Sequence, residues 1–264
     1  MSFTITDENL LQVLDALRKI DSVDAVAIGG SRSTGNNDNK SDYDIYVYCT
    51  EDVGFESRSN ALVPLCSQTE ICNHYWESED NCIMNNGIPI DVIYRKVDMF
   101  EEYLNRLAEG SMSMNGYTTA FWHNIITCQV VFDKSGRFTE LKKKFTIPYP
   151  EKLRESIIDN NRRLLSGKLP SYDKQIKKAA ERGDLVSVHH RITEFLASYF
   201  DIIFALNRMT HPGEKRLVQI CKNQCKALPD KFEENINALL ASVTKGGSYE
   251  IVTKMIAELD KVLD

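Results

Sequence analysis

The residues of this chain that could perform chemistry are concentrated in GGSRSTGNNDNKSDYDIYVY, from Gly29 to Tyr48. An apolar run, VDAVAI, ends at Gly29 and Gly30, which predicts a strand followed by a sharp turn that presents backbone N–H groups to an anion. Asp42 and Asp44 follow with one residue between them, so in an extended chain their carboxylates lie on the same face. Two adjacent carboxylates repel unless a cation lies between them. The spacing therefore predicts a site for a hard divalent ion such as Mg²⁺.

A third carboxylate follows in NGIPIDVIYR, where Asp91 lies within a second apolar run that predicts a strand. The Asn85-Asn86-Gly87 sequence before it is a hairpin signal, so CIMNNGIPIDVIYR is expected to form two paired strands. If the Asp91 strand also pairs with the strand that carries Asp44, three carboxylates meet at one edge of a sheet. An Asp-rich surface turn is the alternative, but the turn, the pair and the third acid together favour a functional site.

This arrangement resembles the DNA polymerase β-type nucleotidyltransferase superfamily, and within it the small-molecule nucleotidyltransferases such as the aminoglycoside and lincosamide resistance enzymes. The resemblance covers roughly residues 23 to 95, in the order and spacing of the family. It implies that Asp42 and Asp44 bind two Mg²⁺ ions and that Asp91 shares one ion and is a candidate to accept the proton of the acceptor hydroxyl. In-line displacement at phosphorus is catalysed mainly by positioning and charge neutralisation, which a pair of metal ions supplies.

The same resemblance implies that the glycine turn binds the co-substrate, a nucleoside triphosphate. Ser31 would hold the triphosphate together with the backbone amides of Gly29 and Gly30. Arg32 departs from the simple pattern, and it is either a further phosphate contact or a solvated helix residue.

Length, composition and charge limit the remaining possibilities. A chain of 264 residues with 42% hydrophobic content is long enough for two domains of modest size. Its net charge of −6 argues against a nucleic-acid partner, because DNA or long RNA normally requires a basic surface. An acidic surface suits a small cationic hydroxyl acceptor, such as an aminoglycoside, and metal and nucleotide binding is an equal explanation of local acidity.

The cysteine pattern and the absence of a long apolar run predict a cytoplasmic protein. Seven cysteines show no paired spacing, and no secretory segment opens the sequence. No apolar run approaches the length needed to span a membrane, so no membrane partner is expected. The oligomeric state is left open between monomer and homodimer.

The candidate residues must be positioned by the elements around them. We expect an amphipathic helix in TDENLLQVLDALRKI, capped by Thr6 or Asp7, and a polar loop over residues 50–60. The acidic residues Glu70, Glu77, Glu79 and Asp80 are interpreted mainly as a solvated loop, with a role in acceptor binding or base catalysis as the alternative. A helix over KVDMFEEYLNRLAEG, a strand in ITCQVVFD and a short basic helix in GRFTELKKKF follow.

Pro148 and Pro150 break the pattern and predict a domain boundary, with a nucleotidyltransferase catalytic domain over residues 1–147 and a helical domain over 148–264. Four or five helices are expected in the second domain, and the longest, from about Asp184 to Met209, is apolar nearly all round and should form its axis. A polar turn, NRMTHPGEKR, follows this helix. By resemblance to the family, Asn207 is a candidate contact of the sugar or base, and Lys215 and Arg216 of the triphosphate; a plain capping loop is the alternative.

Together these patterns predict an α+β protein, in which a mixed β-sheet with helices is followed by a helical bundle that completes the nucleotide and acceptor cleft. The expected reaction is transfer of a nucleoside monophosphate, with AMP as the expected group, from a Mg²⁺-bound triphosphate to a hydroxyl of a small molecule, such as an antibiotic. Pyrophosphate would be released. The alternatives are transfer to a protein hydroxyl, as in toxin–antitoxin pairs, and a catalytically idle nucleotide-binding scaffold. The intact set of three carboxylates argues against the idle scaffold.

Overall fold

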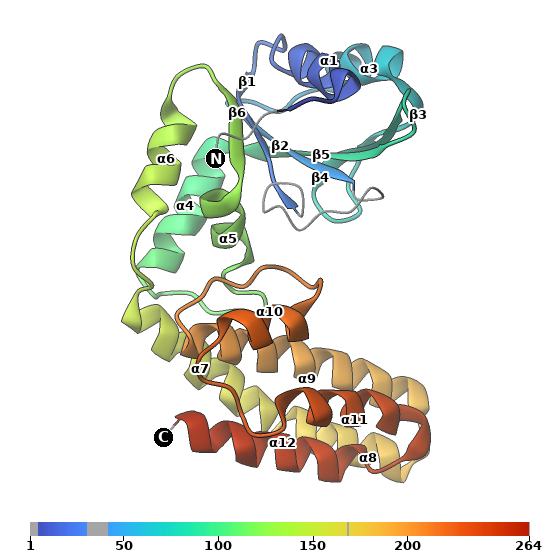
Figure 1. Cartoon of the computed structure of the whole chain (residues 1–264), viewed down its shortest axis with the longest axis vertical. Coiled ribbons are helices and arrows are strands. Elements are labelled where there is room, and N and C mark those ends of the chain that lie inside the picture. The colour runs from blue at the N-terminus through green and yellow to red at the C-terminus, as the bar shows by residue number, and fades with distance from the viewer. Residues whose placement is uncertain (1–4, 31–41, 168, 264) are drawn as a thin grey trace. The chain divides into compact units, whose positions relative to one another are not determined.

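The computed structural model describes residues 5–30, 42–167 and 169–263 of the chain, and it divides the chain into two compact units (Figure 1). The first unit holds Met1–Asn105 and Asn124–Ile147, and the second holds Arg106–His123 and Pro148–Asp264. Residues 106–123 thus belong to the second unit, together with everything from Pro148 onward. Each unit has its own hydrophobic core.

A six-stranded mixed sheet forms the centre of the first unit, with the strand order β3-β4-β5-β2-β1-β6. Its strands are β1 (Val23–Ile28), β2 (Tyr43–Cys49), β3 (Cys66–Asn73), β4 (Ser78–Met84), β5 (Pro89–Lys96) and β6 (Gln129–Asp133). Strands β2 and β5 pair in parallel, and the other neighbouring strands pair antiparallel. The hairpin predicted from Asn85-Asn86-Gly87 is confirmed, since the turn between β4 and β5 is closed by the Gly87 N–H, which donates to the Met84 carbonyl at 2.8 Å.

One face of this sheet is apolar because side chains alternate along each strand. Residues such as Ile45, Val47 and Val92 contribute to a core with α1 (Glu8–Leu17) and α3 (Phe55–Leu62), which lie over this face in Figure 1. Helix α1 begins as predicted, because the Asp7 carboxylate accepts the N–H groups of Asn9 and Leu10. A short 3-10 helix, η1 (Val63–Leu65), connects α3 to β3.

The opposite face is divided between a covered end and an end that carries acids. Tyr48 stacks against Phe138 of α6 (Arg137–Phe145) at 4.0 Å between ring centroids, and it contacts Phe100 of α4 (Val97–Ala108) at 5.5 Å. Tyr48 lies on β2 on the same face as Asp44, four residues further along. Helices α4 and α6 therefore pack over the Tyr48 end of β2, while Asp44 and Asp91 remain half-buried at the other end. Helix α5 (Ala120–Thr127) precedes β6.

Helices form the second unit, around a core of buried aromatic and aliphatic side chains. They are α7 (Glu151–Leu165), α8 (Tyr172–Glu181), α9 (Leu185–Leu206), α10 (Leu217–Gln224), α11 (Phe232–Lys245) and α12 (Ser248–Leu263). Helix α9 is the longest, its residues from Ser198 to Leu206 are all buried, and α7, α8 and α11 contact it. The α+β fold class and the predicted axis of the helical part are confirmed.

Three expectations about local structure were wrong. Residues 55–60, expected to belong to a loop, lie in helix α3, because the polar sequence FESRSNAL buries Arg58 together with Ala61 and Leu62. Glu79 and Asp80 lie on strand β4 and are buried, so they do not belong to a solvated loop. From Glu151 onward the described part of the chain contains six helices rather than four or five. Among all the residues that the structure describes, no helix has the length and apolar character to cross a membrane.

Candidate nucleotidyl-transfer site

Asp44 and Asp91 lie opposite one another on the parallel strands β2 and β5, in the register that pairs Asp44 with Asp91. Neighbouring strands lie about 4.8 Å apart, and paired residues point to the same face, so these two carboxylates share one side of the sheet. Both residues are half-buried. The pairing of the Asp91 strand with the Asp44 strand, on which the sequence argument depended, is present in the structure.

The Gly29-Gly30 turn lies directly against this pair. The Gly29 N–H donates to the Asp44 carbonyl at 2.9 Å, which extends the β1–β2 pairing by one residue. Gly30 has a φ of 64°, and a Cβ atom on Gly30 would lie 1.7 Å from Oδ2 of Asp44. A Cβ atom on Gly29 would lie 2.1 Å from a ring carbon of Tyr46. Two glycines at these positions therefore allow the turn backbone to approach the Asp44 carboxylate as closely as it does.

The remaining members of the predicted site lie at or beyond the edge of the described segment. Asp42 is half-buried and directly precedes β2, and Tyr43 between the two aspartates is buried toward the apolar face, as the alternation predicts. Ser31 and Arg32 lie outside the described residues. Over the described ranges, no group of three or more His, Cys, Asp or Glu side chains is arranged to hold a metal ion. The assembly of Asp42 with Asp44 and Asp91 around metal ions stays a prediction.

The donor chemistry of the pair fits a divalent cation. Asp44 and Asp91 supply hard carboxylate oxygens on adjacent strands, which is the ligand type that Mg²⁺ prefers. The backbone of the glycine turn lies directly beside the Asp44 carboxylate. A larger residue at Gly30 would fill the space that the Asp44 carboxylate occupies.

Two polar residues on β4 extend the site: Asn81, which was not identified from the sequence, and Glu79, which was considered only as the less favoured alternative to a solvated loop. Asn81 pairs with Asp91 across β4 and β5, and its side-chain Nδ2 donates to Oδ1 of Asp91 at 2.7 Å. Glu79 is 5% exposed, and burial together with the negative charges of Asp91 and Glu77 raises the pKa of its carboxyl. The predicted hairpin contained the signal for Asn81, because counting back from its turn places Asn81 opposite Asp91.

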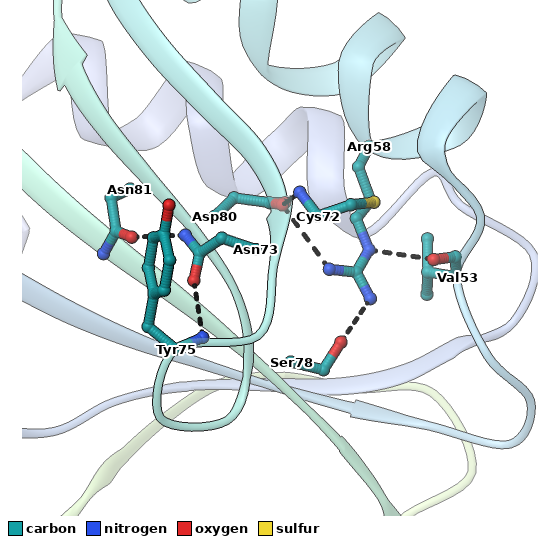
Figure 2. A network of polar contacts seen from close by, with 8 residues as sticks. All are labelled: Val53, Arg58, Cys72, Asn73, Tyr75, Ser78, Asp80 and Asn81. Atoms are coloured by element: carbon teal, nitrogen blue, oxygen red, sulfur yellow. Dashed lines mark hydrogen bonds and ion pairs between the residues drawn. The ribbon is translucent and has the colours of Figure 1, made fainter.

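The other face of the same strands carries a buried ion pair that anchors them to α3 (Figure 2). Arg58 donates to the Val53 carbonyl and to the Ser78 hydroxyl, both at 2.8 Å, and its guanidinium lies 3.4 Å from Asp80. Asp80 also accepts the Cys72 N–H at 2.6 Å. Because Asp80 is fully buried and its carboxylate faces Arg58, we assign it a structural role rather than one in acceptor binding.

Glu77 is also held by an arginine. The Arg95 guanidinium binds the Glu77 carboxylate through two hydrogen bonds, at 2.7 and 2.8 Å, and lies over the rings of Tyr46 and Phe100. This bidentate pair fixes the segment between β3 and β4 to the sheet.

The candidate nucleotide contacts of the second unit have different surroundings. The side-chain amide of Asn207 donates to the carbonyls of Ile203 and Ala227 and accepts the N–H groups of Lys226 and Ala227, at 2.8 to 2.9 Å. This amide fixes the turn after α10, so we do not include Asn207 in the proposed nucleotide site. Lys215 and Arg216 are exposed, and Arg216 is the N-cap residue of α10.

A cavity of about 730 Å³ lies within the second unit beside the start of α10. Tyr117, Phe200, Glu214, Arg216 and Lys222 contribute to its lining. Its apolar floor is formed by α9 and α11, so it belongs to the helical unit alone.

A buried carboxylate, Asp201, lies on α9 in the helical unit. Asp201 accepts hydrogen bonds from the hydroxyl and the N–H of Thr118, at 2.6 and 3.1 Å, and from Nδ2 of Asn161 at 3.3 Å. Burial raises the pKa of Asp201 to about 7, although these hydrogen bonds lower it. Asp201 therefore holds the loop before α5 against α7 and α9 within this unit.

Comparison with known protein families assigns the sheet-containing part of the chain. Residues 10–107 match the family model described as a nucleotidyltransferase domain. Residues 10–107 therefore form a nucleotidyltransferase domain. The matched part of the chain contains β1 to β5, the Gly29-Gly30 turn and the carboxylates Asp42, Asp44 and Asp91. Residues 118–217 match a second family model, a domain of unknown function (DUF4037), which contains Asn207, Lys215 and Arg216.

Several solved structures are similar to this chain at low sequence identity. A nucleotidyltransferase-like protein from Exiguobacterium sibiricum is 8% identical, with a TM-score of 0.43 over 97% of this chain and 73% of that one. An aminoglycoside 6-adenyltransferase from Bacillus subtilis is 11% identical, with a TM-score of 0.30 over 98% and 92% of the two chains. A CCA-adding enzyme from Thermotoga maritima, complexed with tRNA, is 14% identical, with a TM-score of 0.31 over 98% and 82%. No match is found among curated proteins.

Proposed function

We propose that this nucleotidyltransferase transfers a nucleoside monophosphate, with AMP as the expected group, from a Mg²⁺-bound nucleoside triphosphate to a hydroxyl of a small molecule. The observation that carries the proposal is the in-register pairing of Asp44 with Asp91 beside the Gly29-Gly30 turn. Two carboxylates on one face and a turn of backbone amides are the parts that phosphoryl transfer requires.

In the proposed reaction, the acceptor oxygen attacks the α-phosphorus of the triphosphate. A bond forms between that oxygen and the α-phosphorus, the bond from the α-phosphorus to the bridging oxygen breaks, and pyrophosphate leaves with the electron pair. Asp42, Asp44 and Asp91 would hold two Mg²⁺ ions, which would neutralise the charge of the phosphates. Asp91 accepts the hydroxyl proton, and the amides of Gly29 and Gly30, with Ser31 and Arg32, bind the triphosphate.

Lys215 and Arg216 are proposed as further triphosphate contacts, supplied by the helical domain over residues 148–264. Both are exposed cations that could form charge-assisted hydrogen bonds with phosphate oxygens. The division into a catalytic domain over residues 1–147 and a domain that completes the cleft belongs to the same proposal.

The acceptor is proposed to be a small cationic molecule, for which an aminoglycoside antibiotic is the test case. The net charge of −6 supports an acceptor of opposite charge and argues against tRNA or another nucleic acid. A cytoplasmic location is proposed because all seven cysteines are free thiols.

The test is incubation of the purified protein with each nucleoside triphosphate and MgCl2, in the presence of an antibiotic panel, tRNA or a cell extract. We expect pyrophosphate release together with a mass increase of a small molecule by one nucleoside monophosphate. Asp91→Asn should remove both signals. A mass increase of a protein or of tRNA, rather than of a small molecule, would refute the proposed acceptor class. Pyrophosphate release that persists in Asp91→Asn would refute the proposed role of Asp91.

A further inference from the structure

The carboxylate of Asp91 is held by a series of hydrogen bonds between side-chain amides, which begins at a backbone N–H between β3 and β4. The Tyr75 N–H donates to Oδ1 of Asn73 at 3.4 Å, and Nδ2 of Asn73 donates to Oδ1 of Asn81. Nδ2 of Asn81 then donates to Oδ1 of Asp91 at 2.7 Å. Figure 2 shows the first two contacts, with Asn73 between the Tyr75 backbone and Asn81.

The two ends of this hydrogen-bond series determine the orientation of each side-chain amide. A backbone N–H can only donate, so the atom of Asn73 that meets Tyr75 must be its oxygen, and its nitrogen must face Asn81. The oxygen of Asn81 receives that nitrogen, which leaves the nitrogen of Asn81 facing Asp91. The other end is a carboxylate, which accepts hydrogen bonds when ionised. Only one assignment of oxygen and nitrogen in the Asn73 and Asn81 amides therefore satisfies all three hydrogen bonds.

We propose that Asn81 is a positioning residue that orients the Asp91 carboxylate for metal binding. This inference rests on the proposed function, because it takes Asp91 as a metal ligand. The Asn81 amide engages Oδ1 of Asp91 from β4, whereas Asp44 lies on β2, on the other side of β5. It also places a donor beside Asp91 on a strand where the neighbouring acid, Glu79, repels the Asp91 charge.

The partial burial of Asn81 and Asp91 separates this role from a purely structural one. Arg58 and Asp80, on the other face of the hairpin, are buried and tie it to α3. Asn81 and Asp91 are both half-exposed, and hydrogen bonds in such surroundings contribute little to folding because water competes for the same groups. Partners that orient ligating carboxylates, by contrast, commonly change metal affinity by about 10 to 100-fold.

The test is titration of the full-length protein with MnCl2, followed by electron paramagnetic resonance, which distinguishes free from bound Mn²⁺. Asn81→Ala should weaken Mn²⁺ binding by about 10 to 100-fold. Asn85→Ala is the matched control, since it removes an exposed amide just after the same strand, and it should bind Mn²⁺ as the wild type does. If Asn81→Ala does not fold, Asn81→Leu replaces it, because leucine keeps the volume without the donor.

A double-mutant cycle decides whether Asn81 acts through Asp91. Asp91→Asn alone should weaken Mn²⁺ binding, and adding Asn81→Ala to it should weaken binding no further, because the group that Asn81 orients is gone. Independent, multiplying losses in the double variant would overturn the inference, as would wild-type affinity in Asn81→Ala. If Asp91→Asn itself binds Mn²⁺ normally, the metal role of Asp91 in the proposed function fails, and the inference fails with it. If Asp91→Asn loses Mn²⁺ affinity and Asn81→Ala does not, the inference about Asn81 fails while the metal role of Asp91 stands.

Discussion

Replacing Gly30 by alanine should separate metal binding from stability. The left-handed φ of 64° costs an alanine about 1–2 kcal/mol of folding free energy. The new Cβ would also lie 1.7 Å from Oδ2 and 2.8 Å from Cγ of Asp44, well inside van der Waals contact. Because these atoms belong to a rotatable side chain, Asp44 can turn away, so the clash should displace the carboxylate rather than unfold the sheet.

Gly136→Ala provides the matched control for the backbone effect. Gly136 has a φ of 77°, and no atom lies within 4 Å of the Cβ position. Both variants should therefore lose the same free energy of unfolding, about 1–2 kcal/mol, in thermal or urea unfolding. Only Gly30→Ala should lose Mn²⁺ affinity, by at least about tenfold, in a titration followed by electron paramagnetic resonance. Equal Mn²⁺ affinity in the two variants would refute the argument that the Gly30 backbone sets the position of Asp44.

Three further predictions concern the proposed site and the helical unit. Asp42→Asn and Asp44→Asn should each abolish nucleotidyl transfer, yet leave the melting temperature in metal-free buffer equal or higher, because the carboxylates repel one another without a cation. Lys215→Ala should weaken ATP binding by roughly 1.5–3 kcal/mol in titration calorimetry, and unchanged affinity would remove the helical domain from the nucleotide site. For Asp201, the folded pKa of about 7 exceeds the ordinary 3.8, so its stabilising contribution is complete below pH 3.8 and is lost as the pH rises toward 7. The melting temperature of Asp201→Asn relative to that of the wild type should accordingly rise between pH 3.8 and 7. A difference in melting temperature that is constant with pH would contradict the titration of a buried Asp201.

The sequence predicted the central strands and the Asp44–Asp91 pair because those segments follow simple alternation. Apolar residues frame each aspartate, and the Asn85-Asn86-Gly87 turn places β4 beside β5. The parallel pairing of β2 with β5 was a hypothesis, since no local pattern connects two strands so far apart in the chain. Its confirmation places Asp44 and Asp91 opposite one another in the candidate site.

Elements with buried polar residues could not be predicted in the same way. Helix α3 was expected to be a loop because its sequence is polar, yet Arg58 is buried where its guanidinium meets Asp80 and lies 3.8 Å from the centroid of the Tyr94 ring. Glu79 and Asp80 were likewise assigned to solvent because acidic residues usually lie there. Hydropathy patterns treat each residue alone, whereas these residues are buried together with partners from distant parts of the chain.

The parallel junction of β2 and β5 makes the candidate site depend on the docking of two groups of strands that are separate in sequence. Strands β1 and β2 form one antiparallel pair, and β3, β4 and β5 form an antiparallel meander from consecutive segments, so both can form from contacts local in sequence. Asp44 belongs to the first group and Asp91 to the second, and only the docking of one group on the other brings them together. A chain in which this junction opens would keep most of its strand pairing but lose both activity and metal affinity. A metal ion that requires both carboxylates would, by mass action, hold the junction closed, so hydrogen exchange at β2 and β5 should slow when Mn²⁺ is added.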